Sequence, residues 1–143
     1  MYLYKNKMVV LFDQFNLPDD VFEVIFATKQ QVIVAKLLIR HMKENKNEIG
    51  KTEMSLFATK LHEGKMQTVI DEPGYKGKKV KLSYNKRQFY DRILTPMKSM
   101  GLIDYDLYKK TYSVSERFNK NMMRIGLMWL QELRKPPVDY EIT

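Results

Sequence analysis

Cysteine is absent from this 143-residue sequence, and only two histidines, His41 and His62, are present. A chain without cysteine has no disulfides, no thiolate metal sites and no cysteine nucleophile. The two histidines are well separated in sequence, and each falls in a predicted helix, where packing or surface exposure is the usual role. No catalytic or metal-ligand motif occurs. We therefore expect neither an enzyme nor a bound metal or cofactor.

Long apolar runs are also absent, since no stretch approaches the 18 consecutive apolar residues of a membrane-spanning helix. The first twelve residues contain too short an apolar run for a signal peptide, and no small-residue cleavage site follows. We therefore expect a cytoplasmic protein. Apolar residues make up 44% of the chain and charged residues 29%, which is typical of a globular domain that buries a core.

The net charge of +8 comes mostly from one short segment. Residues 75–92 carry a net charge of +6, whereas residues 1–30 carry −1, residues 31–74 carry +1 and residues 93–143 carry +2. This basic segment ends inside a predicted helix whose outer side is polar. Concentrated positive charge next to hydrogen-bond donors and acceptors favours nucleic-acid binding over a merely solvated charged surface.

The apolar pattern predicts an α+β fold, mainly α. Thr28 and Gln31 have the spacing of a capping box, and Glu63-Gly64 and Pro136-Pro137 are helix stops. Near the N-terminus, residues 16–27 fit either a helix with Pro18 at its first position or a short strand. The expected elements are a strand or hairpin in 2–12, helix 28–44, strand 48–51, helix 52–62 capped by Thr52, two strands in 65–83, helix 84–100 capped by Ser83 or Asn85, strands 102–106 and 110–115, and helix 115–135 capped by Ser115.

The helix at 84–100 is the centre of the prediction. Phe89, Ile93, Met97 and Met100 are spaced by four, four and three residues, so they share one face. Pro96 removes one backbone donor and should kink this helix or shorten its regular part. Gly101 provides the left-handed position that ends a helix. The residues expected on the outer side are Tyr84, Arg87, Gln88, Asp91, Thr95 and Lys98, with Arg92 at the margin.

Residues 28–134 resemble the winged helix-turn-helix family of DNA-binding regulators, including small archaeal, plasmid and viral members. The resemblance rests on Ile93-Leu94, Met97, Met100-Gly101-Leu102-Ile103 and Lys110-Thr111-Tyr112-Ser113-Val114-Ser115. It implies that the third helix enters the major groove and that the following hairpin is the wing. This chain differs from the family by an extra hairpin of about 20 residues between helices two and three, and by Pro96.

The chemistry of these side chains predicts sequence-specific contacts with double-stranded DNA. Arg87 has two donors that match guanine, Gln88 matches adenine, and Asp91 can accept from cytosine or orient a neighbouring arginine. Lysines on the two hairpins are expected at phosphates, although ordinary solvated lysines are the alternative. The predicted DNA-binding residues are Tyr84, Asn85, Lys86, Arg87, Gln88, Asp91, Arg92, Thr95, Lys109, Lys110, Lys76, Lys78 and Lys79.

The last helix is apolar on more than one side, which indicates burial on more than one side. We expect it to join two copies as a homodimer, through Met122, Ile125, Met128, Trp129 and Leu133. The alternative is that the N-terminal strands cover it within one chain. The expected division is an N-terminal segment at 1–27, a DNA-binding domain at 28–115, a C-terminal helix at 116–135 and a loose tail at 136–143.

Transcriptional regulation is the expected role of such a dimer. A plasmid or viral replication or partition factor, and a winged-helix module that binds protein, remain the alternatives. No small-molecule effector site is identifiable from the sequence.

Overall fold

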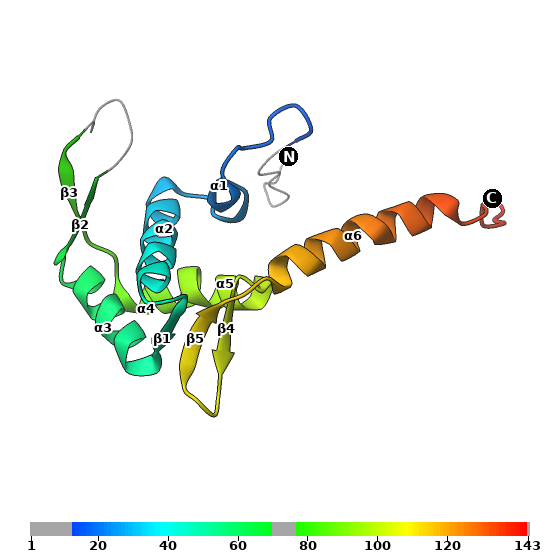
Figure 1. The fold of residues 1–143 in the computed structure, drawn as a ribbon. Helices are drawn as coiled ribbons and strands as arrows, with labels where there is room; N and C mark the ends of the chain where they lie inside the picture. The colour runs from blue at the N-terminus through cyan, green and yellow to red at the C-terminus, as the bar shows by residue number, and fades with distance from the viewer. Residues whose placement is uncertain (1–12, 70–76, 143) are drawn as a thin grey trace.

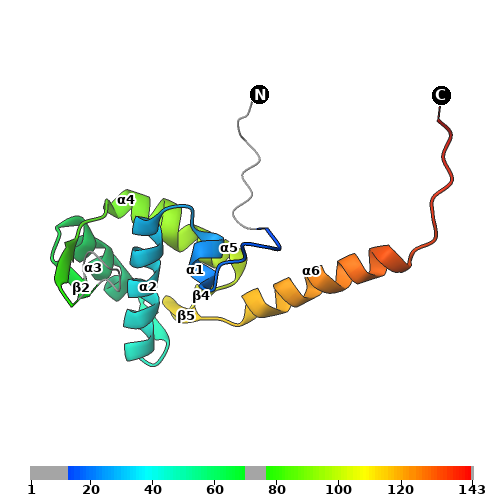
Figure 2. The same ribbon diagram turned by 90° about the horizontal axis from the view of Figure 1, so that it is seen from above.

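A hairpin and a long C-terminal helix project from a helical body (Figures 1 and 2). The structure is a computed structural model that describes residues 13–69 and 77–142, so the strand or hairpin expected in residues 2–12 lies outside the described residues. The elements are α1 (Val21–Ile25), α2 (Lys29–Glu44), β1 (Glu48–Gly50), α3 (Lys51–His62), β2 (Met66–Val69), β3 (Lys79–Leu82), α4 (Lys86–Phe89), the π-helical turn η1 (Tyr90–Leu94), α5 (Thr95–Met100), β4 (Ile103–Asp106), β5 (Thr111–Val114) and α6 (Arg117–Arg134). The predicted α+β class is confirmed.

The helix α2 begins at the predicted capping box. The Gln31 N–H donates to the Thr28 hydroxyl oxygen at 3.2 Å, and the Thr28 N–H donates to the Gln31 side-chain oxygen at 3.4 Å. These bonds satisfy donors that have no partner inside the helix. Farther along α2, Leu38 and Met42 are fully buried in the core.

The residues before α2 also form a helix, so the alternative of a strand at 16–27 is wrong. The helix α1 begins three residues after Pro18, at Val21, because the Asp20 carboxylate accepts from the Phe22 N–H at 2.9 Å and caps it. Asp20 also pairs with Lys36 of α2, and this hydrogen bond holds the pKa of the carboxyl below its ordinary value. The pairing joins α1 to α2.

The helix α3 begins at Lys51, one residue before the predicted cap residue Thr52. Gly50 occupies the cap position, and no side chain makes a capping bond there. Sheet pairing explains the difference. Gly50 is the last residue of β1 and pairs with Thr111, and the next N–H, that of Lys51, donates to the Lys110 carbonyl at 2.9 Å. One face of α3 is buried, and its members are Met54, Phe57, Ala58 and Leu61.

A three-stranded antiparallel sheet has the strand order β1-β5-β4. Ile49 of β1 pairs with Tyr112 of β5, and Tyr112 pairs with Tyr105 of β4. Ile49, Tyr112 and Ile103 are buried, so one side of this sheet belongs to the core. The sheet therefore connects α3 to the hairpin β4–β5 at the other end of the sequence.

The segment between α3 and α4 forms the predicted second hairpin. Strands β2 and β3 pair antiparallel from Met66 with Leu82 to Val69 with Lys79. Leu82 is buried at the base of the hairpin, whereas Gln67 and Lys81 are exposed. This hairpin extends away from the body, in the direction opposite to the β4–β5 tip (Figure 1).

Residues 86–100 form one helical stretch, called the central helix below, in which α4, η1 and α5 follow without a break. The π-helical turn η1 ends directly before Thr95-Pro96, at the start of α5. Pro96 donates no backbone hydrogen bond, so the regular α-helical parts before and after η1 are short, as predicted. Gly101 ends the stretch with φ +87°, the predicted left-handed position.

The helix α6 leaves the body and extends away from it (Figures 1 and 2). The predicted cap at Ser115 is wrong by one residue, because Glu116 occupies the cap position and makes no side-chain capping bond, although the Ser115 hydroxyl accepts from the Arg117 N–H at 3.1 Å. The helix ends at Arg134, just before Pro136-Pro137. None of its 18 residues is buried. Among the described residues, no helix is long and apolar enough to span a membrane.

Candidate nucleic-acid interface

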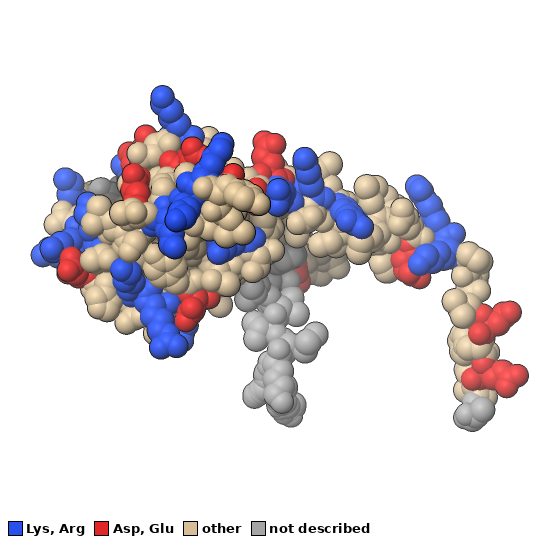
Figure 3. All heavy atoms as spheres, turned by 90° about the horizontal axis from the view of Figure 1, so that it is seen from below, with Lys and Arg blue, Asp and Glu red and all other residues tan. Residues whose placement is uncertain are grey.

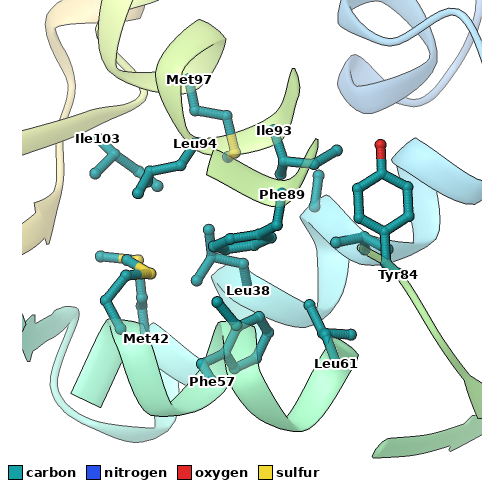
Figure 4. Close-up of a cluster of buried hydrophobic side chains, with 14 of the residues drawn as sticks. Leu38, Met42, Phe57, Leu61, Tyr84, Phe89, Ile93, Leu94, Met97 and Ile103 are labelled. Atoms are coloured by element: carbon teal, nitrogen blue, oxygen red, sulfur yellow. The ribbon is translucent and has the colours of Figure 1, made fainter. Parts of the chain in front are cut away.

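The central helix is fixed to the body by its buried side. Figure 4 shows this side facing the apolar side chains of α2 and α3. The buried residues involved are Phe89, Ile93, Leu94 and Met97 of the central helix, with Leu38, Met42, Phe57 and Leu61 opposite them. Close packing of this kind leaves the helix little freedom to rotate. The opposite side is therefore presented to solvent in a defined orientation.

Five polar side chains, called the outer face below, cover that opposite side. All five are exposed, which confirms the predicted orientation: Arg87, Gln88, Asp91, Arg92 and Thr95. The Arg87 side chain is 92% exposed, and its Nε lies 3.8 Å from an Asp91 carboxylate oxygen. An exposed pair one helical turn apart contributes little stability. Arg87 is therefore available to a ligand.

Asn85 fixes the first turn of the outer face. Its side-chain oxygen accepts from the Gln88 N–H at 3.1 Å, so Asn85, and not Ser83, caps the helix. The prediction had left both residues open. Because the Asn85 oxygen is used in the cap, Asn85 sets where the helix begins.

Tyr84 was predicted on the outer side, and this is wrong, because the residue is buried with 6% of its surface exposed. It precedes the helix, in the extended segment after β3, so helical spacing does not describe its direction. The Tyr84 N–H donates to the Leu61 carbonyl at the end of α3 at 3.0 Å. This bond turns the ring into the core (Figure 4).

Lys86 was predicted to contact DNA, and in the structure its ammonium is directed to α3. Its ammonium donates to the Thr59 hydroxyl at 2.9 Å and to the Ser55 hydroxyl at 3.2 Å, both on α3. Its backbone N–H donates to His62 Nδ1 at 3.0 Å. Lys86 therefore connects the start of the central helix to α3 along its last two turns.

The sheet continues the polar surface of the central helix. Lys98 is exposed, and its ammonium lies 5.7 Å from the centre of the Tyr105 ring and 5.9 Å from that of Tyr112. The two rings are 4.5 Å apart across β4 and β5. Burial raises the pKa of Tyr112. The sequence placed Lys98 on the outer side, but only the strand register reveals its two aromatic neighbours.

The tip of the β4–β5 hairpin carries the two lysines that the sequence singled out. Lys109 and Lys110 are exposed, as predicted, and Lys110 has φ +53°. Asp106 Oδ1 accepts from the N–H groups of Tyr108 at 2.9 Å and Lys109 at 3.1 Å, which lowers the pKa of the Asp106 carboxyl. Tyr108 is 98% exposed, and the sequence analysis did not select it.

A cleft of about 730 Å³ lies between the start of α3 and this hairpin. Three lysines line it, two from the hairpin tip and Lys51 from the first turn of α3. The N-terminal end of a helix carries a partial positive charge, which adds to theirs. The lining residues are Gly50, Lys51, Thr52, Ser55, Leu56, Thr59, Lys109, Lys110 and Thr111. Sequence analysis missed Lys51 because these segments meet only in the folded chain.

Two of the remaining predicted lysines lie at the start of β3 or just before it. Lys78 and Lys79 are exposed, and Lys76 lies outside the described residues. Because the β2–β3 hairpin and the β4–β5 hairpin point in opposite directions in Figure 1, they do not form one continuous surface at their tips. The view from below shows Lys and Arg side chains spread over the body and along α6, with acidic side chains between them (Figure 3).

Comparison with protein-family models, with curated proteins and with solved structures gives no match to this chain. In the described residues, no group of three or more His, Asp or Glu side chains is arranged to hold a metal ion. The site is therefore interpreted from its own geometry, as a polar helix face beside a lysine-lined cleft.

Proposed function

We propose that this protein binds double-stranded DNA sequence-specifically, with the outer face of the central helix in the major groove. The main support for the proposal is the way this helix packs against the body. Its inner side is buried in the core, while its outer face presents exposed donors and acceptors. The major groove of B-DNA admits an α-helix and displays a distinct donor and acceptor pattern for each base pair.

The side chains of the outer face suit base edges. Arg87 is nearly free of intramolecular contacts and has two donors that match O6 and N7 of guanine. Gln88 has the donor and acceptor pair that matches adenine. Asp91, next to Arg87, either orients the guanidinium or accepts from cytosine. A solvent-exposed face without a ligand is the simplest alternative, and the experiment below separates the two.

The order of elements supports a winged helix-turn-helix arrangement. Helices α2 and α3 and the central helix come before the β4–β5 hairpin, and β1 pairs with β5 to complete the sheet. The β2–β3 hairpin is then an insertion between the second and third helices. In this arrangement β4–β5 is the wing, and its lysines, with Lys51 of the neighbouring cleft, bind phosphates.

A homodimer joined through α6 completes the proposal. The five residues selected from the sequence for this contact are all exposed: Met122, Ile125, Met128, Trp129 and Leu133. Two-fold symmetry in the protein matches an inverted repeat in DNA, with the two central helices in successive major grooves about one helical turn apart. Transcriptional regulation is the role that we propose for such a dimer.

Selection of bound sequences from random duplex DNA, followed by fluorescence anisotropy at two salt concentrations, tests the proposal. We expect an inverted repeat to be enriched and the affinity to fall steeply with salt, because bound lysines displace counterions from phosphates. Binding without sequence preference would remove base recognition from the proposal. Absence of binding even at low salt would overturn it.

A further inference from the structure

The helix α6 exposes more apolar surface than an isolated helix in water can sustain. It has 18 residues, none of them buried, and it extends away from the body (Figures 1 and 2). Eight of its large apolar side chains are between 42% and 69% exposed. They are Met122, Met123, Ile125, Leu127, Met128, Trp129, Leu130 and Leu133. Isolated helices of this length are marginal in water, and contiguous exposed apolar patches mark contact surfaces.

The spacing of these residues defines a seam along one side of α6. Phe118, Met122, Ile125 and Trp129 follow one another at intervals of four, three and four, which is the spacing of the core positions of a coiled coil. On a helical wheel of 100° per residue, Arg124 and Gln131 fall on the opposite side. The seam is therefore one side of α6, and the opposite side carries these two polar side chains beside the apolar Leu127 and Met123.

From this pattern we infer that α6 packs against α6 of a second copy in the antiparallel direction, which specifies the contact in the homodimer proposed above. In antiparallel pairs, the two kinds of core position face each other across the seam. Phe118 then meets Trp129 of the second copy, and Met122 meets its Ile125. The two-fold symmetry repeats both contacts, so four apolar layers form. Aromatic pairs such as Phe118 with Trp129 add to the burial of their surface.

Glu132 distinguishes the antiparallel pair from the parallel one. It lies seven residues after Ile125, and so at the next position of the same seam. In a parallel pair, each Glu132 faces the other inside the seam, where like charges repel and burial of a carboxylate is unfavourable. In the antiparallel pair, Glu132 lies past the last apolar layer, beside the first turn of the second copy, which contains Arg117.

The present contacts of Glu132 allow this change of partner. In the single chain it forms an exposed pair with Lys135 at 3.2 Å. Exposed pairs three residues apart contribute little stability. Arg117 is also largely exposed, and its partner Asp104 lies 3.4 Å away. The carboxylate of Glu132 is therefore free to add a contact to a second copy.

A negatively charged membrane surface would also attract an amphipathic helix with basic residues. We favour the second copy because four apolar residues of α6 follow coiled-coil spacing and a carboxylate, Glu132, lies in line with them. A carboxylate at the apolar boundary opposes insertion into an anionic surface. The second copy accommodates it next to Arg117.

The absence of cysteine makes site-specific spin labelling straightforward. Arg124→Cys and Gln131→Cys place one label each on the side away from the seam, seven residues apart and therefore at the same heptad position. In the proposed pair, the two Arg124 residues lie almost level with each other along the helix axis, near its midpoint. The two Gln131 residues are offset along the axis by about 22 Å, from 15 residues at 1.5 Å each. Pulsed electron paramagnetic resonance should report a clearly longer distance for Gln131 than for Arg124. Equal distances mean a parallel pair and overturn the inference.

Two matched variants test whether the seam holds the dimer. Ile125→Glu lies in the seam and Leu127→Glu outside it, and the wild-type side chains are similarly exposed, at 53% and 58%. Sedimentation of the full chain without DNA should show that Ile125→Glu raises the dissociation constant of the dimer at least about 100-fold, because a buried unpaired carboxylate is costly. Leu127→Glu should change it by less than about 10-fold. Similar losses in both variants would contradict the seam.

The wild-type chain provides the remaining outcomes. A monomer at micromolar concentration overturns the inference, and a monomer that binds vesicles of anionic phospholipid assigns α6 to a membrane surface instead. DNA binding is measured separately on the same samples. An antiparallel dimer that fails to bind DNA removes the proposed DNA binding and leaves this inference standing. A monomer that binds DNA overturns this inference and the homodimer, and leaves the proposed DNA binding standing.

Discussion

The ammonium of Lys86 lies 2.9 Å from the hydroxyl oxygen of Thr59. The Thr59 hydroxyl donates its own proton to the Ser55 carbonyl at 2.9 Å, so its lone pairs are free to accept from Lys86. A lysine in the most basic part of the sequence thus acts within the protein. It connects α3 to the helix that we propose enters the major groove.

Lys86→Met should lower the free energy of unfolding by about 1 kcal/mol, because two hydrogen bonds from a charged donor are lost at a half-buried site. Urea denaturation measures this change. Lys43→Met, at an exposed position of α2, is the control and should change stability by less than about 0.5 kcal/mol. Equal stability of the two variants would mean that the connection to α3 contributes nothing.

Arg87→Ala should weaken binding to the selected DNA sequence by about 1–3 kcal/mol while changing binding to random DNA much less, because a base contact discriminates and a phosphate contact does not. Lys79→Ala should weaken both by similar factors. Anisotropy titrations on the two DNAs measure the difference. Arg40→Ala on α2, where only an exposed pair with Glu44 is lost, is the control. If Arg87→Ala weakens both DNAs equally, the outer face makes no base contact.

Tyr84→Ala should destabilise the protein by about 3 kcal/mol, since a large buried side chain is removed. Tyr84→Phe keeps the ring, so its DNA affinity should equal that of the wild type and its stability should change by less than about 1.5 kcal/mol. Thermal unfolding and anisotropy measure the two properties. If a Tyr84→Phe variant folds normally but binds DNA weakly, the Tyr84 hydroxyl contributes to DNA binding.

Gly101→Ala should destabilise the protein by more than about 1 kcal/mol, because the residue has φ +87° and an added Cβ would lie 2.9 Å from the Phe118 nitrogen. Gly50→Ala is the control. Gly50 has a negative φ and no atom within 4 Å of an added Cβ, so the change should stay below about 1 kcal/mol. Urea denaturation compares them. Equal effects would contradict the close approach of α6 to Gly101.

The β4–β5 tip should lose order in acid. The N–H groups of Lys109 and Tyr108 hold the pKa of Asp106 below its ordinary value of 3.8. Because the pKa is lowered in the folded state, the ionised carboxylate stabilises the tip at pH values above the ordinary pKa. This stabilisation is lost as the pH falls through the lowered pKa. Amide hydrogen exchange at Tyr108 and Lys109 should become faster in Asp106→Ala. It should change less in Asp106→Asn, which keeps an acceptor. Unchanged exchange in Asp106→Ala would contradict this role.

Elements with a local cause were predictable from the sequence. The capping box at Thr28 and the glycine stop at Gly101 depend on residues within one helical turn, and both are confirmed. The exposure of Arg87 and Gln88 follows from helical spacing alone. The sequence also predicted burial of α6 on more than one side, whereas none of its 18 residues is buried in the structure.

The positions that sequence reasoning misjudged depend on partners far away in the chain. The start of α3 is set by pairing of Gly50 with Thr111, and Tyr84 turns inward through a bond to Leu61. In each case a hydrogen bond across the fold overrides the local preference. Helical spacing describes a residue only where the helix has already begun.

The sequence by itself determined the helices, the hairpins and the polar outer face, because periodicity and capping act over a few residues. Only the tertiary structure decided that Lys86 forms hydrogen bonds to α3 and that Lys51, Lys109 and Lys110 line one cleft. Lys86 and Thr59 are 27 residues apart, and Lys51 is farther from the hairpin tip. Contacts at such separations follow from how the core packs, and the spacing of residues along the chain does not specify them.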